Sequence, residues 1–490
     1  MLGVIEGIVA AARRNPARPA VITGNRSVVY GDLVEAIARI SNHLVQRGLP
    51  PRSKLFLNIG DPDLRLIVTI AAMHAGFIPF VLLAIGDLAD QVDYDFVVGA
   101  AVPNLPDLPA DLTIDQSVLS GKLSDGTLRE FPEQPDDAIL LISATSGSTG
   151  RPKLVAESYG ASRLRSRLRG LVPGEGEIAP PVWYQQTRDD RLLCTLGDVT
   201  FAGLVTALQT LAVGATFLRM SRDRRETLKF VNLYDANRIK TTPGTLGELM
   251  DAMDKAGIAC PSVRQIMLVG GLIDRQLLER VTHHFESEIT VAYGATEIGR
   301  ISSGVIDPSN FEPGYVGELF PEMKIATSGT RSDPAPLVIV RDEATAYVPY
   351  YVNGKVVPLN GPFYTLPDVG FIEDGRLYLL GRDDEVLNIS GNKVAYSVID
   401  SGLRAMPGVR DVAIVSAAGI GDPSGLIVGV VGEVDADLSA LADRVKAIVK
   451  APETAERVRL FRIAEIPRNA FGKTDRGRVT AAYRRQAEGA

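Results

Sequence analysis

The sequence predicts an α/β protein with a large N-terminal domain of layered α/β subdomains plus a β subdomain, and a small α+β C-terminal domain on a hinge. Three observations predict this. Helical periodicity alternates with short apolar runs over the first part of the chain, as in helices that cover a sheet. About residues 303–381, helical periodicity disappears and short β runs stand between frequent Pro and Gly. A separate strand–helix alternation then follows, so we predict domains at 1–381 and 385–490 joined by a hinge at 382–384.

The first predicted element is an N-terminal amphipathic helix. Arg13 and Arg14 follow its apolar stretch, a charge order that does not fit a secretory signal. Residues 87–137 are rich in Asp, Pro and Leu and predict a long surface excursion. The other elements expected in this half are helices 32–48 and 63–75 and strands Lys54–Ile59, Phe77–Leu83 and Ala138–Ser143.

One apolar run, Leu66–Ile85, is long enough to be weighed as a membrane span. His74, Gly76 and Pro79 lie near its centre, so we predict a buried helix followed by a buried strand instead. The later predicted elements are helix 200–212, strand 215–219, helix 224–237, the run IMLVGG, helix 274–286, the run ITVAYG, strands Leu337–Val340 and Arg376–Leu380, helix 397–406, strands near 411–416 and 426–433, and helix 438–450.

Composition excludes several classes of protein. The chain has 490 residues, of which 46% are hydrophobic and 23% charged, as in globular rather than disordered proteins. Its 52 basic and 59 acidic residues leave a net charge of −7, which does not favour a nucleic-acid partner. Cys194 and Cys260 are too few for a disulfide scaffold and lack metal-ligand spacing, so we expect a reducing, cytoplasmic location.

A loop of glycines and hydroxyls carries the strongest functional signal. The string TSGSTGRPK, Thr145–Lys153, directly follows a predicted apolar strand. Successive backbone N–H groups in such a turn form a concave anion site, hydroxyls add donors, and glycines let the anion approach closely. Arg151 and Pro152 separate Gly150 from the lysine, so the loop is not a Walker A loop.

The full string resembles the phosphate-binding signature of the AMP-forming adenylating superfamily, which includes acyl- and aryl-CoA ligases, nonribosomal peptide synthetase adenylation domains and luciferase. The segment Tyr293-Gly-Ala-Thr-Glu297 is similar to a second signature of that family. The resemblance implies that Tyr293 stacks on the purine, Thr296 contacts the α-phosphate and Glu297 is the Mg²⁺ ligand.

Two further segments resemble the family around its hinge. Tyr364-Thr-Leu-Pro-Asp368 is a partial match, since Leu366 and Pro367 replace a Thr-Gly pair, and it implies that Asp368 binds the ribose. The run from Gly381 to Lys393 is similar to the segment that opens the C-terminal domain. There the resemblance implies Arg382 near the ribose, Asp384 at the hinge and Gly391 beside the thiol. Lys393 stands where arginine is common, and Val398 stands where glutamate is frequent.

The C-terminal segment Ile466–Thr474 resembles the lysine loop of the family, although Phe471 replaces a small hydroxyl residue. It implies that Lys473 is the catalytic lysine, acting with Thr296 and Glu297. The nucleotide-binding residues implied by the resemblance are Thr145, Ser146, Gly147, Ser148, Thr149, Gly150, Lys153, Gly270, Gly271, Tyr293, Gly294, Ala295, Asp368, Arg382 and Lys393.

The acid pocket is less well defined by the sequence. Family geometry places it between residues 183–204, the turn that ends at Leu272, and Gly294-Ala295, with Thr200 where relatives often carry histidine or an aromatic residue. The candidate pocket residues are Trp183, Tyr184, Thr200, Phe201 and Leu272. We favour an aromatic or medium-chain monocarboxylic acid, while Arg188 and Arg191 leave a dicarboxylate open.

The resemblance implies an acid–thiol ligase that uses ATP, Mg²⁺ and most simply coenzyme A. Two alternatives stay open. One is an adenylation enzyme that loads the phosphopantetheine of an acyl carrier protein. The other is a non-catalytic nucleotide-binding relative, suggested by the departures at Thr200, Leu366 and Val398. Arg163, Arg165, Arg167 and Arg169 are candidate contacts for the 3′-phosphate of coenzyme A, although a solvated charged helix face explains them better.

Overall fold

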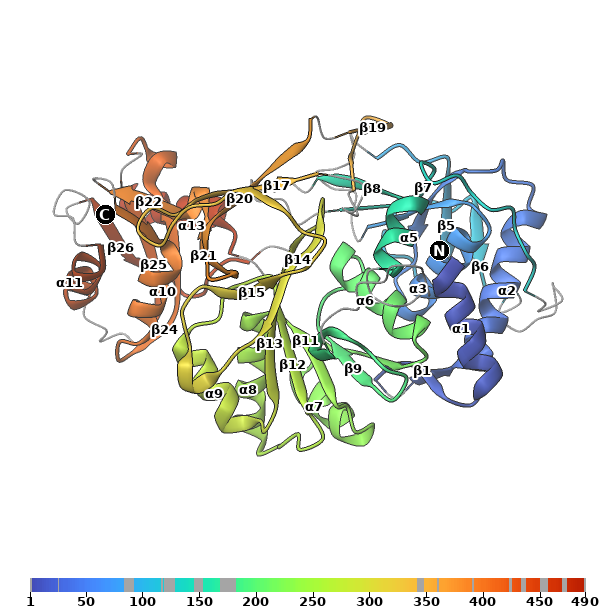
Figure 1. Ribbon diagram of the computed structural model, residues 1–490, viewed down its shortest axis with the longest axis horizontal. Coiled ribbons are helices and arrows are strands. Elements are labelled where there is room, and N and C mark those ends of the chain that lie inside the picture. The colour runs from blue at the N-terminus through green and yellow to red at the C-terminus, as the bar shows by residue number, and fades with distance from the viewer. Residues whose placement is uncertain are drawn as a thin grey trace.

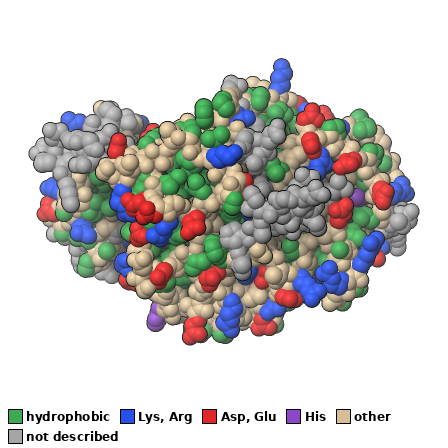
Figure 2. Space-filling view, viewed as in Figure 1, with side chains coloured by type: hydrophobic (Ala, Val, Ile, Leu, Met, Phe, Trp, Pro, Cys, Tyr) green, Lys and Arg blue, Asp and Glu red, His purple; other side chains and the backbone are tan. Residues whose placement is uncertain are grey.

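A computed structural model describes most of the chain: residues 2–24, 26–82, 92–115, 118, 128–144, 153–167, 182–341, 348–358, 361–389, 392–422, 425–432, 438–449, 457–468 and 474–488. Two large sheets with their helices make up the larger part of the molecule, and the C-terminal elements gather at one end (Figure 1). The mixed α/β class predicted from the sequence is confirmed. Figure 2 shows acidic and basic side chains interspersed over one face.

The larger sheet has a parallel centre. Within the described residues its order is β16-β17-β20-β21-β15-β14-β13-β12-β11-β9-β10-β1-β2. The strands from β1 to β13 pair in parallel through β10, β9, β11 and β12, and β14 onward pair antiparallel. The bounds are β1 Pro19–Thr23, β2 Arg26–Val29, β9 Arg191–Cys194, β10 Thr216–Arg219, β11 Arg238–Thr241, β12 Gln265–Val269, β13 Glu288–Ala295, β14 Gly299–Val305, β15 Tyr315–Leu319, β16 Ile325–Thr327, β17 Ala335–Val340, β20 Phe363–Glu373 and β21 Arg376–Arg382.

The second sheet has the order β19-β18-β8-β7-β4-β3-β5-β6 among the described residues. Its strands are β3 Lys54–Asn58, β4 Ile78–Val81, β5 Phe96–Ala100, β6 Leu112–Ile114, β7 Ile139–Ala144, β8 Leu154–Ser158, β18 Tyr350–Val352 and β19 Lys355–Val357. β5 and β6 contradict the surface excursion predicted for 87–137, because both pair in parallel beside β3. Val97 and Val98 are buried there, so tertiary pairing overrides the loop-like composition.

Helices lie between the sheets and on the outer face of the larger one. Their bounds are α1 Leu2–Arg14, α2 Tyr30–Gln46, α3 Pro62–His74, α5 Tyr159–Arg167, α6 Phe201–Ala212, α7 Arg224–Leu233, α8 Pro243–Ala256 and α9 Arg275–His284. α1, α2, α3 and α6 share one apolar core with strands of both sheets. α7, α8 and α9 share a second core on the opposite face of the larger sheet (Figure 1).

Local signals explain where the helices begin and end. The Asp61 carboxylate caps α3 ahead of Pro62, and the Thr242 hydroxyl caps α8 ahead of Pro243. The helix predicted at 224–237 ends early, at Leu233, because the chain turns at Asp235 with a φ of 47° and enters β11. β11 and α8 were not predicted. The helix and strand expected within Leu66–Ile85 are confirmed as α3 and β4.

Past Arg382 the elements form sheets of their own. β22 Val386–Ile389 and β23 Asn392–Ala395 make a hairpin, and β24 Val409–Ser416, β25 Leu426–Gly432 and β26 Val458–Arg462 make a three-stranded sheet. The helices here are α10 Tyr396–Arg404, α11 Leu438–Val449 and α13 Arg476–Glu488; α13 and β26 were not predicted. These elements enclose two apolar cores separate from those of the larger part. The boundary at 382–384 and the β subdomain stay predictions. None of the described helices is both long and apolar enough to cross a bilayer.

Candidate active site

The site lies at one edge of the larger sheet. β9, β11, β12 and β13 are parallel neighbours, so their carboxyl ends meet at this edge. Ligands of open α/β sheets bind in the crevice outside the carboxyl ends of the strands. The predicted residues Gly270 and Gly271 directly follow β12, and Thr296 and Glu297 directly follow β13. Parallel pairing therefore brings two segments of the predicted site together.

Two glycines shape this edge. Gly270 has a φ of 73°, in the left-handed region that side chains disfavour. Gly294 stands on β13 where a Cβ atom would collide with the carbonyl oxygen of Gly299 on β14. Only a residue without a side chain fits there, and the close approach sets up the turn Thr296–Ile298 between the two strands. The turn holds Thr296 and Glu297 half-buried above the end of the sheet.

Tyr293 and Asp368 come from motifs 75 residues apart and meet directly. The Tyr293 hydroxyl donates to Asp368 Oδ2 at 2.7 Å. Arg382 pairs with Asp368 across β20 and β21, with its Nε 3.9 Å from Asp368 Oδ1. Burial and the Asp368 carboxylate raise the pKa of Tyr293, so its hydroxyl keeps the proton that it donates. The hydrogen bond fixes the orientation of the ring predicted to stack on the purine.

The departure at Leu366 and Pro367 is absorbed by a bulge. Val338 pairs with Thr365, and Pro336 pairs with Val369. Between these two pairs β20 therefore contains two more residues than β17. Proline is tolerated at such bulges because its missing N–H breaks no ladder bond. Leu366 is 1% exposed and joins the core, while Asp368 keeps its pairing with β21.

Two tyrosine side chains, Tyr350 and Tyr364, lie beside Glu297, a contact that the sequence did not reveal. The Tyr350 hydroxyl donates to Glu297 Oε1 at 2.8 Å and lies 3.1 Å from the Tyr364 hydroxyl. Lys153 Nζ lies 5.1 Å from the centre of the Tyr350 ring, within cation–π range. Burial, then the Glu297 carboxylate, raise the pKa of Tyr364 to about 12. Tyr350 thus links the end of the hydroxyl loop to the predicted metal ligand.

The residues present fit a magnesium ion of the kind that substrate phosphates complete. Mg²⁺ is often bound by one or two carboxylates together with phosphate oxygens and water, rather than by an all-protein cage. Glu297 supplies such a carboxylate at the carboxyl edge. Among the described residues no group of three or more His, Cys, Asp or Glu side chains forms a metal cluster.

The acid-pocket candidates take different places. Thr200 caps α6 by accepting from Gly203 N at 3.0 Å and donates to Gly197 O, so its hydroxyl serves the helix start. Phe201 is buried under Arg165, whose guanidinium carbon lies 4.8 Å from the ring centre. Trp183 and Leu272 are half-buried beside the sheet and do not line the cavity described next.

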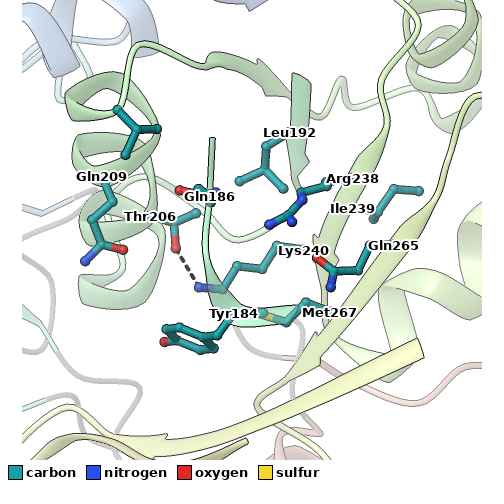
Figure 3. A pocket seen from close by; sticks show the side chains of 11 residues that line it. Tyr184, Gln186, Leu192, Thr206, Gln209, Arg238, Ile239, Lys240, Gln265 and Met267 are labelled. Atoms are coloured by element: carbon teal, nitrogen blue, oxygen red, sulfur yellow. Dashed lines mark hydrogen bonds between the residues drawn. The ribbon is translucent and has the colours of Figure 1, made fainter. Parts of the chain in front are cut away.

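Tyr184 does line a cavity, of about 50 Å³, between α6 and the larger sheet. Figure 3 shows α6 side chains facing side chains of β11 and β12 across it, with the Tyr184 ring beside Lys240. The lining residues are Tyr184, Gln186, Leu192, Thr206, Gln209, Val213, Arg238, Ile239, Lys240, Gln265 and Met267. Sequence reasoning found only Tyr184, because the others carry no motif.

Several predicted residues lie outside the described residues: Thr145, Ser146, Gly147, Ser148, Thr149, Gly150, Gly391 and Lys473. Asp384 falls in a short 3₁₀ turn, Asp383–Glu385, and Lys393 falls on β23, at backbone level. The base of the lysine loop is described. Arg468 and Thr474 form a β-bridge, and Arg476 at the start of α13 forms an ion pair with Glu385 in the predicted hinge region. The loop that carries Lys473 therefore starts and ends close to this turn.

Arg163 and Arg165 of α5 do not share one phosphate-binding face. Arg165 is buried and pairs with the equally buried Glu157 at 3.3 Å, while Arg163 pairs with Asp136. A helix places residues two apart on different faces, which explains the separation. The solvated charged face favoured by the sequence is therefore wrong for Arg165, and its burial also removes it as a contact for the 3′-phosphate of coenzyme A.

Comparison with known proteins decides the family. The AMP-binding enzyme family matches residues 8–357, well over half of the chain. The chain belongs to the AMP-binding enzyme family. Similarity to individual members is low but covers nearly the whole length: a 4-chlorobenzoate–CoA ligase of Arthrobacter sp. is 24% identical over 517 aligned positions, covering 97% of this chain and 94% of the relative.

Other members of the AMP-binding family give the same picture. A 3-hydroxybenzoate–CoA ligase of Aromatoleum sp. (strain CIB) is 22% identical over 94% of this chain and 93% of its own. An O-succinylbenzoate coenzyme A synthetase from Bacillus subtilis, solved in complex with ATP and magnesium ion, superposes with a TM-score of 0.75 at 18% identity. That superposition covers 97% of this chain and 99% of the synthetase, so the fold is shared from end to end.

Proposed function

We propose that this protein is an AMP-forming acid–thiol ligase that activates a carboxylic acid with ATP and transfers the acyl group to coenzyme A. The observation that carries the proposal is the joining of Tyr293, Asp368 and Arg382 beside Glu297 at the carboxyl edge of the sheet, in a chain of the AMP-binding family. The full-length relatives named above are CoA ligases, which supports coenzyme A as the acceptor.

The first half-reaction joins two anions. A carboxylate oxygen of the acid attacks the α-phosphorus of ATP, the bond to the β-phosphate oxygen breaks, and pyrophosphate leaves from an acyl-adenylate. Repulsion between the reactants is the first barrier, and a preorganised cation offsets it. We assign this cation to Lys473, on the loop whose base lies at Arg468 and Thr474.

The adenylate is held by groups from three strands in this proposal. Asp368 accepts from the ribose hydroxyls, Arg382 lies beside it, and the ring of Tyr293 stacks on the purine. Thr296 donates its hydroxyl to the α-phosphate from the turn after β13. Glu297 would hold Mg²⁺, which would supply positive charge that offsets the charge of the departing pyrophosphate.

In the second half-reaction a thiolate attacks the acyl carbonyl, and AMP leaves as the thioester forms. We assign the passage of the thiol to the hairpin that carries Gly391, and the exchange between half-reactions to rotation at Asp384. The separate cores of the C-terminal elements support such a rotation, because a domain with its own core can move as a unit.

We place the protein in the cytoplasm. Its two cysteines, Cys194 and Cys260, are both buried and form no disulfide. A reducing compartment such as the cytoplasm keeps thiols in this free form.

ATP–pyrophosphate exchange over a panel of aromatic and aliphatic acids tests the proposal. We expect at least one acid to raise exchange well above the acid-free rate, and coenzyme A to yield the thioester. If no acid does so, the non-catalytic alternative holds. Replacing coenzyme A with a holo acyl carrier protein in the second step distinguishes the two acceptors.

A further inference from the structure

Helix α6 carries a polar stripe inside the protein. Thr206, Gln209 and Thr210 are spaced three and four residues apart, so they lie on one face of the helix. All three are at most 9% exposed, although buried helix positions normally hold apolar side chains. Thr206 and Gln209 line the cavity beside Tyr184, and Thr210 hydrogen bonds with Gln186, another lining residue. The threonine hydroxyls also donate to the carbonyl oxygens of Ala202 and Thr206 within the helix, and the stripe gives this wall of the cavity a polar character.

Strand β11 brings two cations to the opposite wall. Arg238 and Lys240 alternate with Ile239, so their side chains point to the face of the sheet that α6 covers. Arg238 Nε lies 3.2 Å from Asp190 Oδ1, so its charge is offset at the back of the cavity. Lys240 Nζ donates to the neutral Thr206 hydroxyl at 3.0 Å, across the cavity (Figure 3).

The cavity wall therefore carries cationic side chains and is rich in hydrogen-bonding groups. Of its lining residues, two are cationic, three are glutamines and none is acidic. Its volume of about 50 Å³ holds only a few atoms, because one water already needs roughly 10–15 Å³ by this measure. A long alkyl tail would not fit and would strip water from Lys240 and the glutamines without replacing it.

Strand register places this cavity toward the amino ends of the strands, away from the carboxyl edge where the reaction is proposed to occur. Lys240 pairs with Met267, and Met267 pairs with Thr290 on β13. Gly294, at the edge where the acid is activated in the proposed function, is four residues beyond Thr290, which is about 13 Å along a strand at ~3.3 Å per residue. An acid with its reacting carboxylate at that edge and a ring-sized body would reach Lys240 with its far end.

We propose that Lys240 binds a second anionic group, a carboxylate, at the far end of the acid, so that the enzyme selects a compact dicarboxylic acid. This inference rests on the proposed function, since it assigns the acid pocket of that reaction. It revises the monocarboxylic acid favoured by the sequence. It also replaces Arg188 and Arg191 as candidate ligands, because neither lines the cavity; Arg188 is mostly exposed, and Arg191 Nε donates to Asp235 O at 2.7 Å.

Matched acids test the proposal on the wild-type protein. The acids share one aromatic body and differ only in the far group: carboxylate, carboxamide or methyl. We expect kcat/KM for pyrophosphate exchange to be highest for the carboxylate, by roughly 30-fold or more over methyl, since removing one partner of a buried charge pair costs that much. A wild-type preference for the methyl-ended acid would overturn the inference while leaving the proposed function in place.

Lys240→Met then assigns the preference to the residue. We expect it to lower kcat/KM for the dicarboxylate by roughly 30-fold or more, mainly through KM, and to leave the methyl-ended acid unchanged. Lys229→Met, on the exposed face of α7, is the matched control and should behave as wild type. Circular dichroism checks folding, and Lys240→Gln replaces the variant if it is unfolded. Equal losses on both acids would overturn the assignment.

Direct binding separates the inference from the proposed function. Calorimetric titration of the dicarboxylate into the protein with AMP present requires no turnover. Binding that Lys240→Met weakens supports the inference even if no acid gives exchange, in which case the proposed function alone fails. Binding that is equal in wild type and Lys240→Met overturns the inference.

Discussion

The proposed nucleotide side and the proposed acid side of this site are built in different ways. On the proposed nucleotide side, Tyr293 and Glu297 belong to one short motif at the end of β13 and the turn after it, and Asp368 belongs to a second short motif at the bulge in the middle of β20. On the proposed acid side, the cavity is assembled from single side chains of α6, β9, β11 and β12 and of the segment at Tyr184, which come from separate stretches of the chain. Backbone shape determines the first region, whereas side-chain identity on rigid elements determines the second.

The difference teaches where function can change without loss of fold. A motif residue such as Gly294 cannot be replaced, because its neighbour's carbonyl occupies the space of a side chain. A cavity residue such as Lys240 can be exchanged while strand pairing stays intact. We therefore expect changes on the nucleotide side to affect every acid alike, and changes on the acid side to affect acids selectively.

The largest effect is expected at Lys473. Lys473→Ala should lower pyrophosphate exchange with every acid by on the order of 10²–10³-fold or more, because it removes the cation between two anionic reactants. The same variant should still convert a synthetic acyl-adenylate and coenzyme A to the thioester. Lys255→Ala, on the exposed face of α8, is the control. Exchange near the wild-type rate would show that another cation does this work.

Glu297→Gln is expected to come next. It keeps an oxygen for the Tyr350 hydroxyl but removes the charge that binds Mg²⁺, so exchange should fall on the order of 10²-fold and need more Mg²⁺. The measurement is the exchange rate against Mg²⁺ concentration, with Glu318→Gln on β15 as an exposed control. An unchanged Mg²⁺ dependence would move the metal away from Glu297.

Tyr293→Phe should have a smaller effect. It keeps the ring but removes the 2.7 Å hydrogen bond to Asp368, which is worth about 0.5–1.5 kcal/mol. We expect the KM for ATP to rise roughly 2- to 12-fold, the same factor in a ratio of equilibrium constants, with every acid. A change that depends on the acid used would contradict the separation of the two sides.

The smallest effect is expected in alkaline solution. The pKa of Tyr364 is raised to about 12, so the folded protein keeps a proton that the unfolded chain releases near pH 10. The resulting stability is complete below about pH 10 and is lost as the pH rises toward about 12. Urea unfolding across this range should show a shallower loss for Tyr364→Phe than for wild type. Equal slopes would mean that Glu297 and burial do not hold this proton.

Much of the fold could be predicted from the sequence. Apolar runs such as Ala138–Ser143 and helices such as α3 and α6 lie where periodicity placed them, within a few residues. β5 and β6 were missed because short strands in an Asp- and Pro-rich segment owe their pairing to β3 rather than to their own composition.

The two sides of the site differ in the same respect. The sequence assigned Tyr293 and Asp368 to one nucleotide from separate motifs, and the structure joins them by a hydrogen bond, while their roles stay predictions. Lys240 could not be predicted, because the alternation of polar and apolar residues in β11 is typical of a strand with one face in water. Here α6 covers that face, and no local pattern reveals this.

The bulge at Leu366 and Pro367 affects how homologues of this protein can be recognised. The bulge accommodates two extra residues on β20. Asp368 therefore still pairs with Arg382, although the two residues that usually precede the aspartate in this motif are replaced. Searches that demand fixed letters at fixed intervals would discard this chain. A search for an acid facing a guanidinium across two antiparallel strands would retain it.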